Sequence, residues 1–322
     1  MTKKTLIAVV LTLLYLSSPA FGDVLKAVDG PRPLTAQDQY FMHPIWSPRG
    51  DRLALAGQNY QGLWVINLRD GQLRQISDQL GAGFGPSWDP DGQRIATRVT
   101  ILQDKRRLST IAVYDLEKDE ATELTEQQKN LGLPSWIGGG RKLLFPADGN
   151  IKVVEAPGTS SAVPSASDMV LYLRDGAMVL HQWPESEEKS LQPVEGNILF
   201  CVLSPDQRHV AFEVSGAQLY VVEIDGTGLV ALGRGERPQW SPDGEWITYM
   251  ITVDDGHRIL SSDIYAIRKD GTQKVQITKT PEQLEMNPTW SPDGRLIACD
   301  TRGLGVILLI PVEVERDYPP IR

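Results

Sequence analysis

The sequence has 322 residues, of which 41% are hydrophobic and 23% are charged, and its formal net charge is −9. This composition is ordinary for a soluble globular chain, and a repeat-built domain of this length can bury a sizeable core. An acidic chain is repelled by phosphate backbones and by anionic membrane surfaces, so we expect no nucleic acid partner. Two cysteines are too few for a disulfide framework.

The first 22 residues are predicted to be an export signal. Lys3 and Lys4 supply a positive start, residues 6–16 form an apolar run, and Ala20-Phe21-Gly22 is a small-x-small cleavage site. The apolar run is too short for a membrane-spanning helix. We therefore expect cleavage after Gly22 and no membrane insertion of the mature chain. The mature protein is expected to be periplasmic, or secreted.

A hairpin motif of the form Trp-Ser-Pro-Asp-Gly recurs about every 40 residues along the rest of the chain. The Trp positions of the successive copies are Trp46, Trp88, Trp136, Ala166, Leu203, Trp240 and Trp290. In each copy a short strand ends at this position, Pro and Gly shape a turn, and an apolar strand follows. Two further β-rich runs complete most copies. Four short strands per repeat predict an all-β protein, a β-propeller, rather than an array of helices.

The number of blades depends on the faint copy at Ala166. If it is a true copy the propeller has seven blades, which we favour, because strand-like runs at 170–173 and 178–180 are too many for one blade. Otherwise the ring has six. A proline stands two residues before all but one of the Trp positions. Since proline cannot donate to a strand ladder, this spacing indicates an edge strand, here the innermost strand of each blade.

The last copy lacks an outer strand. After Trp290 only the runs 296–298 and 306–310 precede a polar tail, whereas residues 32–35 resemble the outer strand of the preceding repeat. We expect this N-terminal strand to join the last blade and close the ring, which leaves no exposed sheet edge. The predicted organisation is a signal peptide at 1–22, a β-propeller at 23–312 and a polar C-terminal tail at 313–322.

The repeat pattern Pro-x-Trp-Ser-Pro-Asp-Gly, followed by an apolar strand and an Ile-Tyr-Val-like strand with Asp-Gly, resembles the WD40-like repeats of the TolB-like β-propeller family. The resemblance covers essentially the whole mature chain and is specific in four copies. It implies the propeller fold and suggests that a lipoprotein docks into the channel. TolB proteins carry an α/β domain before the propeller. Residues 23–45 leave no room for it, so we expect the propeller without that domain.

No catalytic set is evident in the sequence. The four histidines occupy different places in their repeats, whereas a metal site needs converging ligands. No Gly-x-Ser-x-Gly elbow occurs. We expect no catalytic residue, no cofactor and no metal. The alternative is an enzyme of the propeller lyase or hydrolase type that acts on a polymer in the central channel.

One face of the predicted ring is the candidate binding surface for a protein or peptide partner. Loops between strands two and three lie there, beside the loops that join one blade to the next. These loops carry apolar residues, and long hairpins are expected around 103–107 and 254–258. Loop aromatics on a rigid scaffold favour binding. The candidate partner-binding residues are Tyr40, Phe41, His43, Phe84, Arg106, Arg237 and Asn287.

Overall fold

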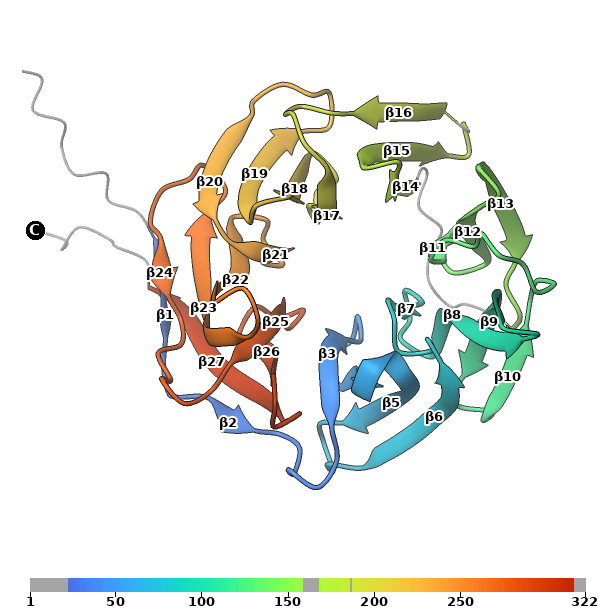
Figure 1. Ribbon diagram of the computed structural model, residues 1–322, viewed down its shortest axis with the longest axis horizontal. Helices are drawn as coiled ribbons and strands as arrows, with labels where there is room; N and C mark the ends of the chain where they lie inside the picture. The colour runs from blue at the N-terminus through green and yellow to red at the C-terminus, as the bar shows by residue number, and fades with distance from the viewer. Residues whose placement is uncertain (1–22, 159–167, 186, 316–322) are drawn as a thin grey trace, which may run out of the picture.

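The structure is a computed structural model that describes residues 23–158, 168–185 and 187–315. Within these residues 27 strands form seven sheets, arranged as blades around a central opening (Figure 1). The prediction of seven blades is therefore confirmed. The copy at Ala166 and the export signal at 1–22 lie outside the described residues. No helix in the described part is long and apolar enough to cross a membrane.

Each blade is an antiparallel sheet whose first strand lies nearest the opening. Blades 1 and 2 comprise β3 (Phe41–Trp46), β4 (Arg52–Gly57), β5 (Gln61–Asn67) and β6 (Leu73–Leu80), then β7 (Ser87–Trp88), β8 (Arg94–Gln103), β9 (Arg106–Asp115) and β10 (Glu120–Glu123). Blades 3 and 4 comprise β11 (Ser135–Ile137), β12 (Lys142–Ala147) and β13 (Asn150–Glu155), then β14 (Asp168–Arg174), β15 (Ala177–Trp183) and β16 (Glu187–Leu191).

The second half of the ring repeats the four-stranded plan. Blades 5 and 6 comprise β17 (Ile198–Leu203), β18 (His209–Val214), β19 (Gln218–Glu223) and β20 (Val230–Arg234), then β21 (Glu236–Trp240), β22 (Trp246–Asp254), β23 (Ile259–Arg268) and β24 (Val275–Gln276). Blade 7 comprises β25 (Glu285–Trp290), β26 (Leu296–Thr301), β27 (Ile307–Glu315), β1 (Val24–Ala27) and β2 (Arg32–Pro33). A 3-10 turn, η1 (Gln58–Tyr60), joins β4 to β5.

The N-terminal segment closes the ring, as predicted. Strand β1 pairs antiparallel with β27, with Val24 opposite Glu315, and β2 pairs further along the same strand, with Arg32 opposite Leu309. Figure 1 shows this blue segment beside the red end of the chain. Leu25 of β1 is fully buried. Strand β27 reaches Glu315, so it includes residues 313–315, which the sequence analysis assigns to the polar tail.

The repeated tryptophans join neighbouring blades. Four indole N–H groups donate to a backbone carbonyl on the inner strand of the preceding blade: Trp46 to Thr289 (3.3 Å), Trp88 to Ile45 (3.2 Å), Trp136 to Ser87 (2.9 Å) and Trp240 to Val202 (3.1 Å). The indole N–H of Trp290 is buried and has no such acceptor within the described chain. Each carbonyl belongs to the residue just before the equivalent Trp position, so the contact repeats with the fold.

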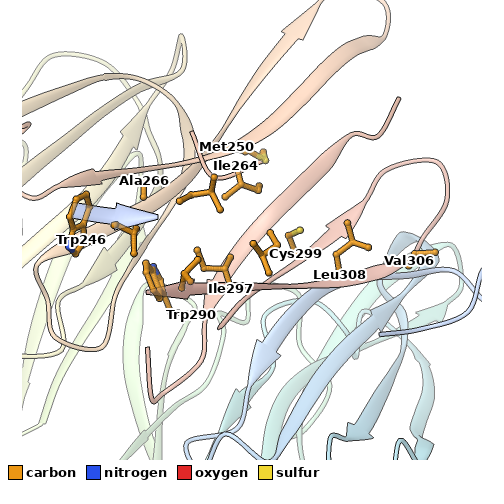
Figure 2. Close-up of a cluster of buried hydrophobic side chains, with 13 residues drawn as sticks. Trp246, Met250, Ile264, Ala266, Trp290, Ile297, Cys299, Val306 and Leu308 are labelled. Atoms are coloured by element: carbon orange, nitrogen blue, oxygen red, sulfur yellow. The ribbon is translucent and has the colours of Figure 1, made fainter. Parts of the chain in front are cut away.

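Apolar side chains fill the space between adjacent blades. Figure 2 shows this for blades 6 and 7, where Trp246 and Ile264 of one blade pack against Trp290, Ile297 and Cys299 of the next. All five are buried. Because each blade is apolar on both faces, no blade can hide its surface from water without both neighbours.

We expect deletion of residues 23–36 to lower the melting temperature by roughly 10 °C or more, because it exposes β27 and the core beneath β1. A point change tests the same contact more gently. Leu25→Ala should cost about 2–4 kcal/mol of unfolding free energy, whereas Val24→Ala, next to it but 43% exposed, should change it by less than about 0.5 kcal/mol. Equal melting curves for both variants would contradict closure by β1.

We also expect the indole–carbonyl bond to be measurable by comparing two tryptophans that are equally buried, each 7% exposed. Trp240→Phe removes the indole hydrogen bond and leaves the carbonyl of Val202 without that donor. Trp290→Phe removes no such bond. The first variant should lose about 1–2 kcal/mol more in urea unfolding than the second. Equal losses would mean that packing alone holds adjacent blades together.

Candidate functional site

Three inner strands begin with a bulge that places one residue in left-handed backbone conformation. His43, Arg237 and Asn287 have φ of 51°, 56° and 52°, and each precedes the proline of its repeat. The ladder between first and second strand shifts register at each of these points. A bulge re-aims the side chain it carries, and this φ is uncommon for residues other than glycine. All three residues line the central opening.

The opening contains a cavity of about 780 Å³. Its wall on the side of blades 2 to 5 is largely apolar and includes Phe84, Leu133, Leu171, Leu199 and Phe200. Of these, Phe84 is 39% exposed, Leu133 37% and Leu199 54%. Large side chains this exposed in a concave wall are typical of a ligand or partner site rather than of a core.

A second cavity of about 510 Å³ lies at the mouth of the first, on the side of blades 5, 6, 7 and 1. Its lining is mostly polar and includes His43, Arg237 and Asn287, which it shares with the larger cavity. It also includes the carboxyl groups of Glu213 and Asp300. The channel therefore has one apolar wall and one polar rim.

Hydrogen bonds hold the polar rim in place. The hydroxyl of Tyr60 and Nε2 of His43 are 2.8 Å apart, and Asn287 Nδ2 donates to Asp300 Oδ1 at 2.8 Å. Burial, with a smaller contribution from the charge of Arg237, lowers the pKa of His43 to about 4. Burial raises the pKa of Asp300 to about 7, although Asn287 and the backbone N–H of His43 donate to it.

Arg237 lies between the two walls. Its guanidinium carbon is 5.2 Å from the ring centre of Phe200, and its backbone N–H donates to Glu213 Oε2 at 3.0 Å. Burial raises the pKa of the Glu213 carboxyl despite this hydrogen bond and the nearby guanidinium. The arginine head group is thus stacked on an aromatic ring and faces the cavity.

The structure brings most of the candidate residues together. Tyr40 lines the rim with His43, Arg237 and Asn287, and Phe84 lines the apolar wall, where its ring packs edge-on against Tyr60. Arg106 is exposed on β9, at the end of the β8–β9 hairpin, and lines neither cavity. The hairpin itself has long arms and a tight turn at Asp104 and Lys105 rather than a long loop.

Phe41 must be withdrawn as a partner-binding residue. It is only 2% exposed and packs edge-to-face on Trp64, with ring centres 5.5 Å apart. The residue opens β3 in the core between blades 1 and 7, so it cannot touch a partner directly.

The sequence pattern did not indicate several residues that line the cavities, among them Tyr60, Arg98, Leu171 and Asp300. They lie on second strands, on η1, or in blade 4, where the repeat is faint. Leu133 was not missed: it directly precedes a repeat proline, as His43, Arg237 and Asn287 do, and this position predicts that it lines the channel mouth. Its side chain also explains Gly85, because a Cβ there would lie 2.6 Å from Leu133.

The site is suited to recognition. No group of three or more His, Cys, Asp or Glu residues within the described ranges could hold a metal ion. The polar groups are instead tied to one another by hydrogen bonds, and the apolar wall stays exposed. Such a surface binds through shape, apolar contact and a few oriented polar groups.

The opposite pKa shifts of Asp300 and His43 predict opposite pH dependences of stability. The folded chain keeps the Asp300 proton between pH 3.8 and about 7, so unfolding free energy falls as pH rises through that range. Between about pH 4 and pH 6.5 His43 is unprotonated in the folded chain but protonated in the unfolded chain. The contribution of His43 to the unfolding free energy therefore rises with pH through that range.

Asp300→Asn should therefore gain stability relative to the parent chain as pH rises from about 4 to 7, reaching roughly 2–4 kcal/mol above pH 7. His43→Asn, which tolerates the left-handed backbone, should show the opposite trend against the parent. Urea unfolding at several pH values between 4 and 8 measures both. A pH-independent difference for Asp300→Asn would show that this carboxyl is ionised in the folded protein at pH 5.

Two curated proteins share a short part of this sequence. A dipeptidyl-peptidase 5 from Porphyromonas endodontalis is 33% identical over 92 residues, covering 24% of this chain and 13% of that protein. A Tol-Pal system protein TolB from Alcanivorax borkumensis is 32% identical over 81 residues, covering 24% of this chain and 18% of that protein. The chain thus matches less than a fifth of the length of either relative. No protein-family model matches it.

Solved structures match over most of the chain. A putative TolB from Agrobacterium tumefaciens superposes with a TM-score of 0.54 and 20% identity, over 89% of this chain and 94% of that one. The WD40 repeats of RRP9 give a TM-score of 0.62 at 11% identity, over 91% and 100% of the two chains. At these identities the likeness concerns the fold. The chain therefore has the fold of a seven-bladed β-propeller, similar in structure to this putative TolB.

Proposed function

We propose that this propeller is exported to the periplasm and serves there as a protein-binding module or scaffold, associated with the cell envelope. The partner docks on the face that carries the loops between blades and covers the mouth of the central cavity. Export is supported by the positive start, short apolar run and cleavage site of residues 1–22. The TolB name of one curated relative and one structural neighbour is consistent with an envelope role.

The proposal rests mainly on the exposed apolar side chains around the cavity. Phe84, Leu133 and Leu199 lie close to rim residues whose hydrogen bonds are already arranged. A protein interface combines such an apolar centre with a polar rim. The left-handed conformation of His43, Arg237 and Asn287 costs free energy, and strain of this kind tends to be kept where a site needs it.

The opposite face of the ring has few groups that are free to bind a partner. It consists of the Ser-Pro-Asp-Gly turns, whose polar groups satisfy one another. In blade 7, for example, Ser291 Oγ donates to Asp293 Oδ1 at 2.6 Å and accepts from the Leu296 N–H at 2.9 Å. The same arrangement recurs at Ser204 and Ser241. Groups already paired in tight turns add little to binding.

Two hairpins extend the proposed face beyond the cavity mouth. Strands β8 and β9 pair along ten residues each, and Leu102 near their turn is 64% exposed. The β22–β23 hairpin of blade 6 carries Val253, which is 46% exposed. Arg106 belongs to the first of these hairpins, so we keep it as a peripheral contact.

Affinity capture of the tagged protein from envelope extracts, with partners identified by mass, tests this proposal. Phe84→Ala and Arg237→Ala should each weaken binding of the captured partner by about 1–3 kcal/mol without lowering the melting temperature, because aromatic and arginine anchors dominate interfaces. Arg49→Ala and Arg208→Ala, exposed on the turn face, are matched controls. If Arg49→Ala and Arg208→Ala lose the partner while Phe84→Ala and Arg237→Ala keep it, the interface lies on the turn face instead.

A further inference from the structure

We propose that the central cavity binds an acidic segment of the partner, a loop or chain end of a few residues whose carboxylates pair with Arg98 and Arg237. The inference rests on the proposed function for the existence of a protein partner. It goes beyond that function by naming the chemistry of the segment that enters the channel.

Arg98 and Arg237 line the same cavity from different sides of the ring. Arg98 lies on β8 of blade 2 and Arg237 on β21 of blade 6. Each guanidinium lies over an aromatic ring, with Arg98 Cζ 5.6 Å from the centre of Phe84 and Arg237 Cζ 5.2 Å from that of Phe200. The rings fix the planar head groups and leave their edges available for hydrogen bonds.

Neither arginine forms a salt bridge in the part of the chain that the structure describes, although the charge of Arg237 partly offsets the burial that raises the pKa of Glu213. Arg98 donates to the carbonyl of Leu131 at 2.6 Å, and Arg237 makes no ion pair with a carboxylate. The described lining of the larger cavity contains no Asp or Glu at all. This is unexpected in a chain with a net charge of −9.

Elsewhere the chain pairs its buried arginine fully. Arg94, 2% exposed and on the same strand as Arg98, donates to Asp89 Oδ2 at 2.7 Å and to two backbone carbonyls. Arg98 is half-buried and has no carboxylate partner, so one carbonyl and one aromatic ring replace only part of its lost hydration. Burial accordingly lowers the pKa of Arg98. An incoming carboxylate would replace the lost water with a charge-assisted, two-pronged hydrogen bond.

Three carboxyl groups at the mouth of the cavity, those of Asp300, Glu213 and Glu236, could repel an acidic segment. Their repulsion is weakened because each accepts a hydrogen bond within the protein. Asp300 has a pKa of about 7 and accepts two hydrogen bonds within the rim. Glu213 accepts the backbone N–H of Arg237, and its pKa is raised by burial. Glu236 accepts the hydroxyl of Thr252. Each of these carboxyl groups therefore already accepts a hydrogen bond from the protein, whereas the two arginines line the larger cavity, whose described lining holds no carboxylate.

The shape of the cavity selects a short, extended and partly apolar segment. A volume of about 780 Å³ is in the range that holds a small ligand, about 300–1,000 Å³, so a folded domain cannot enter. An extended peptide alternates the direction of its side chains. Carboxylates can then reach the two arginines while aliphatic neighbours contact Leu133, Leu171 and Leu173.

Selection from a random heptapeptide phage library on the immobilised exported protein tests this inference. The enriched peptides should combine Asp or Glu with aliphatic or aromatic residues. Synthetic copies of them should bind about 10- to 100-fold more weakly to Arg237→Met or Arg98→Met. Arg208→Met, on the turn face, should bind them like the parent chain. Arg237→Glu should shift the selection toward peptides with Lys or Arg.

Arg98→Met also removes the hydrogen bond to the Leu131 carbonyl and could lower the melting temperature. In that case peptide binding to Arg237→Met alone decides the result. Enrichment of neutral or basic peptides on the parent chain would overturn the inference, as would equal enrichment on the double Arg98→Met, Arg237→Met variant. The absence of any peptide enrichment on the parent chain would also overturn it. In each of these cases the capture experiment with Phe84→Ala still tests the proposed face separately, so the two failures are distinguishable.

Discussion

The ring depends on the contact between each repeat tryptophan and the blade before it. The indole ring fills the space between two sheets. In four of the five copies that keep the Trp, its N–H donates to a carbonyl that the inner strand of the preceding blade leaves free. Inner strands are edge strands, so these carbonyls would otherwise face the opening unpaired. The Trp46 bond to Thr289 joins the first blade to the last, which makes closure of the ring part of the same series.

This contact also explains why the two ends of the inner strands differ. The tryptophan and the following turn fix the end of the strand, where the sequence is nearly constant. The beginning of the strand carries no such constraint, because the proline removes a donor and a bulge shifts the register. His43, Arg237 and Asn287 occupy this freer end. A rigid ring can hold their left-handed backbones, which a mobile loop would relax.

The sequence predicted the fold well because its signals are local. Pro, Asp and Gly shape each turn within five residues, and the missing outer strand could be matched to residues 32–35 by pattern alone. The site was predicted less well because its geometry is not local. Tyr60 meets His43 across a turn, and Arg98 meets Leu131 of the next interblade segment. Phe41 looked like a loop aromatic, yet its neighbours place it in a core.

Blade 2 shows how one strand can serve both the ring and the site. Arg94 and Arg98 lie four positions apart on β8, so an extended strand directs both to the same face. Near the turn, Asp89 stands where other repeats have serine, and it pairs with Arg94, which in turn reaches carbonyls of Gly140 and Pro157 in the next blade. That network ties blade 2 to a blade with only three described strands. Arg98 lies four residues further along β8, toward the bulged ends of the inner strands. There it donates to a single carbonyl, that of Leu131, and its side chain lines the cavity. Position along the strand, and not residue type, therefore decides which arginine is bound within the ring and which lines the cavity.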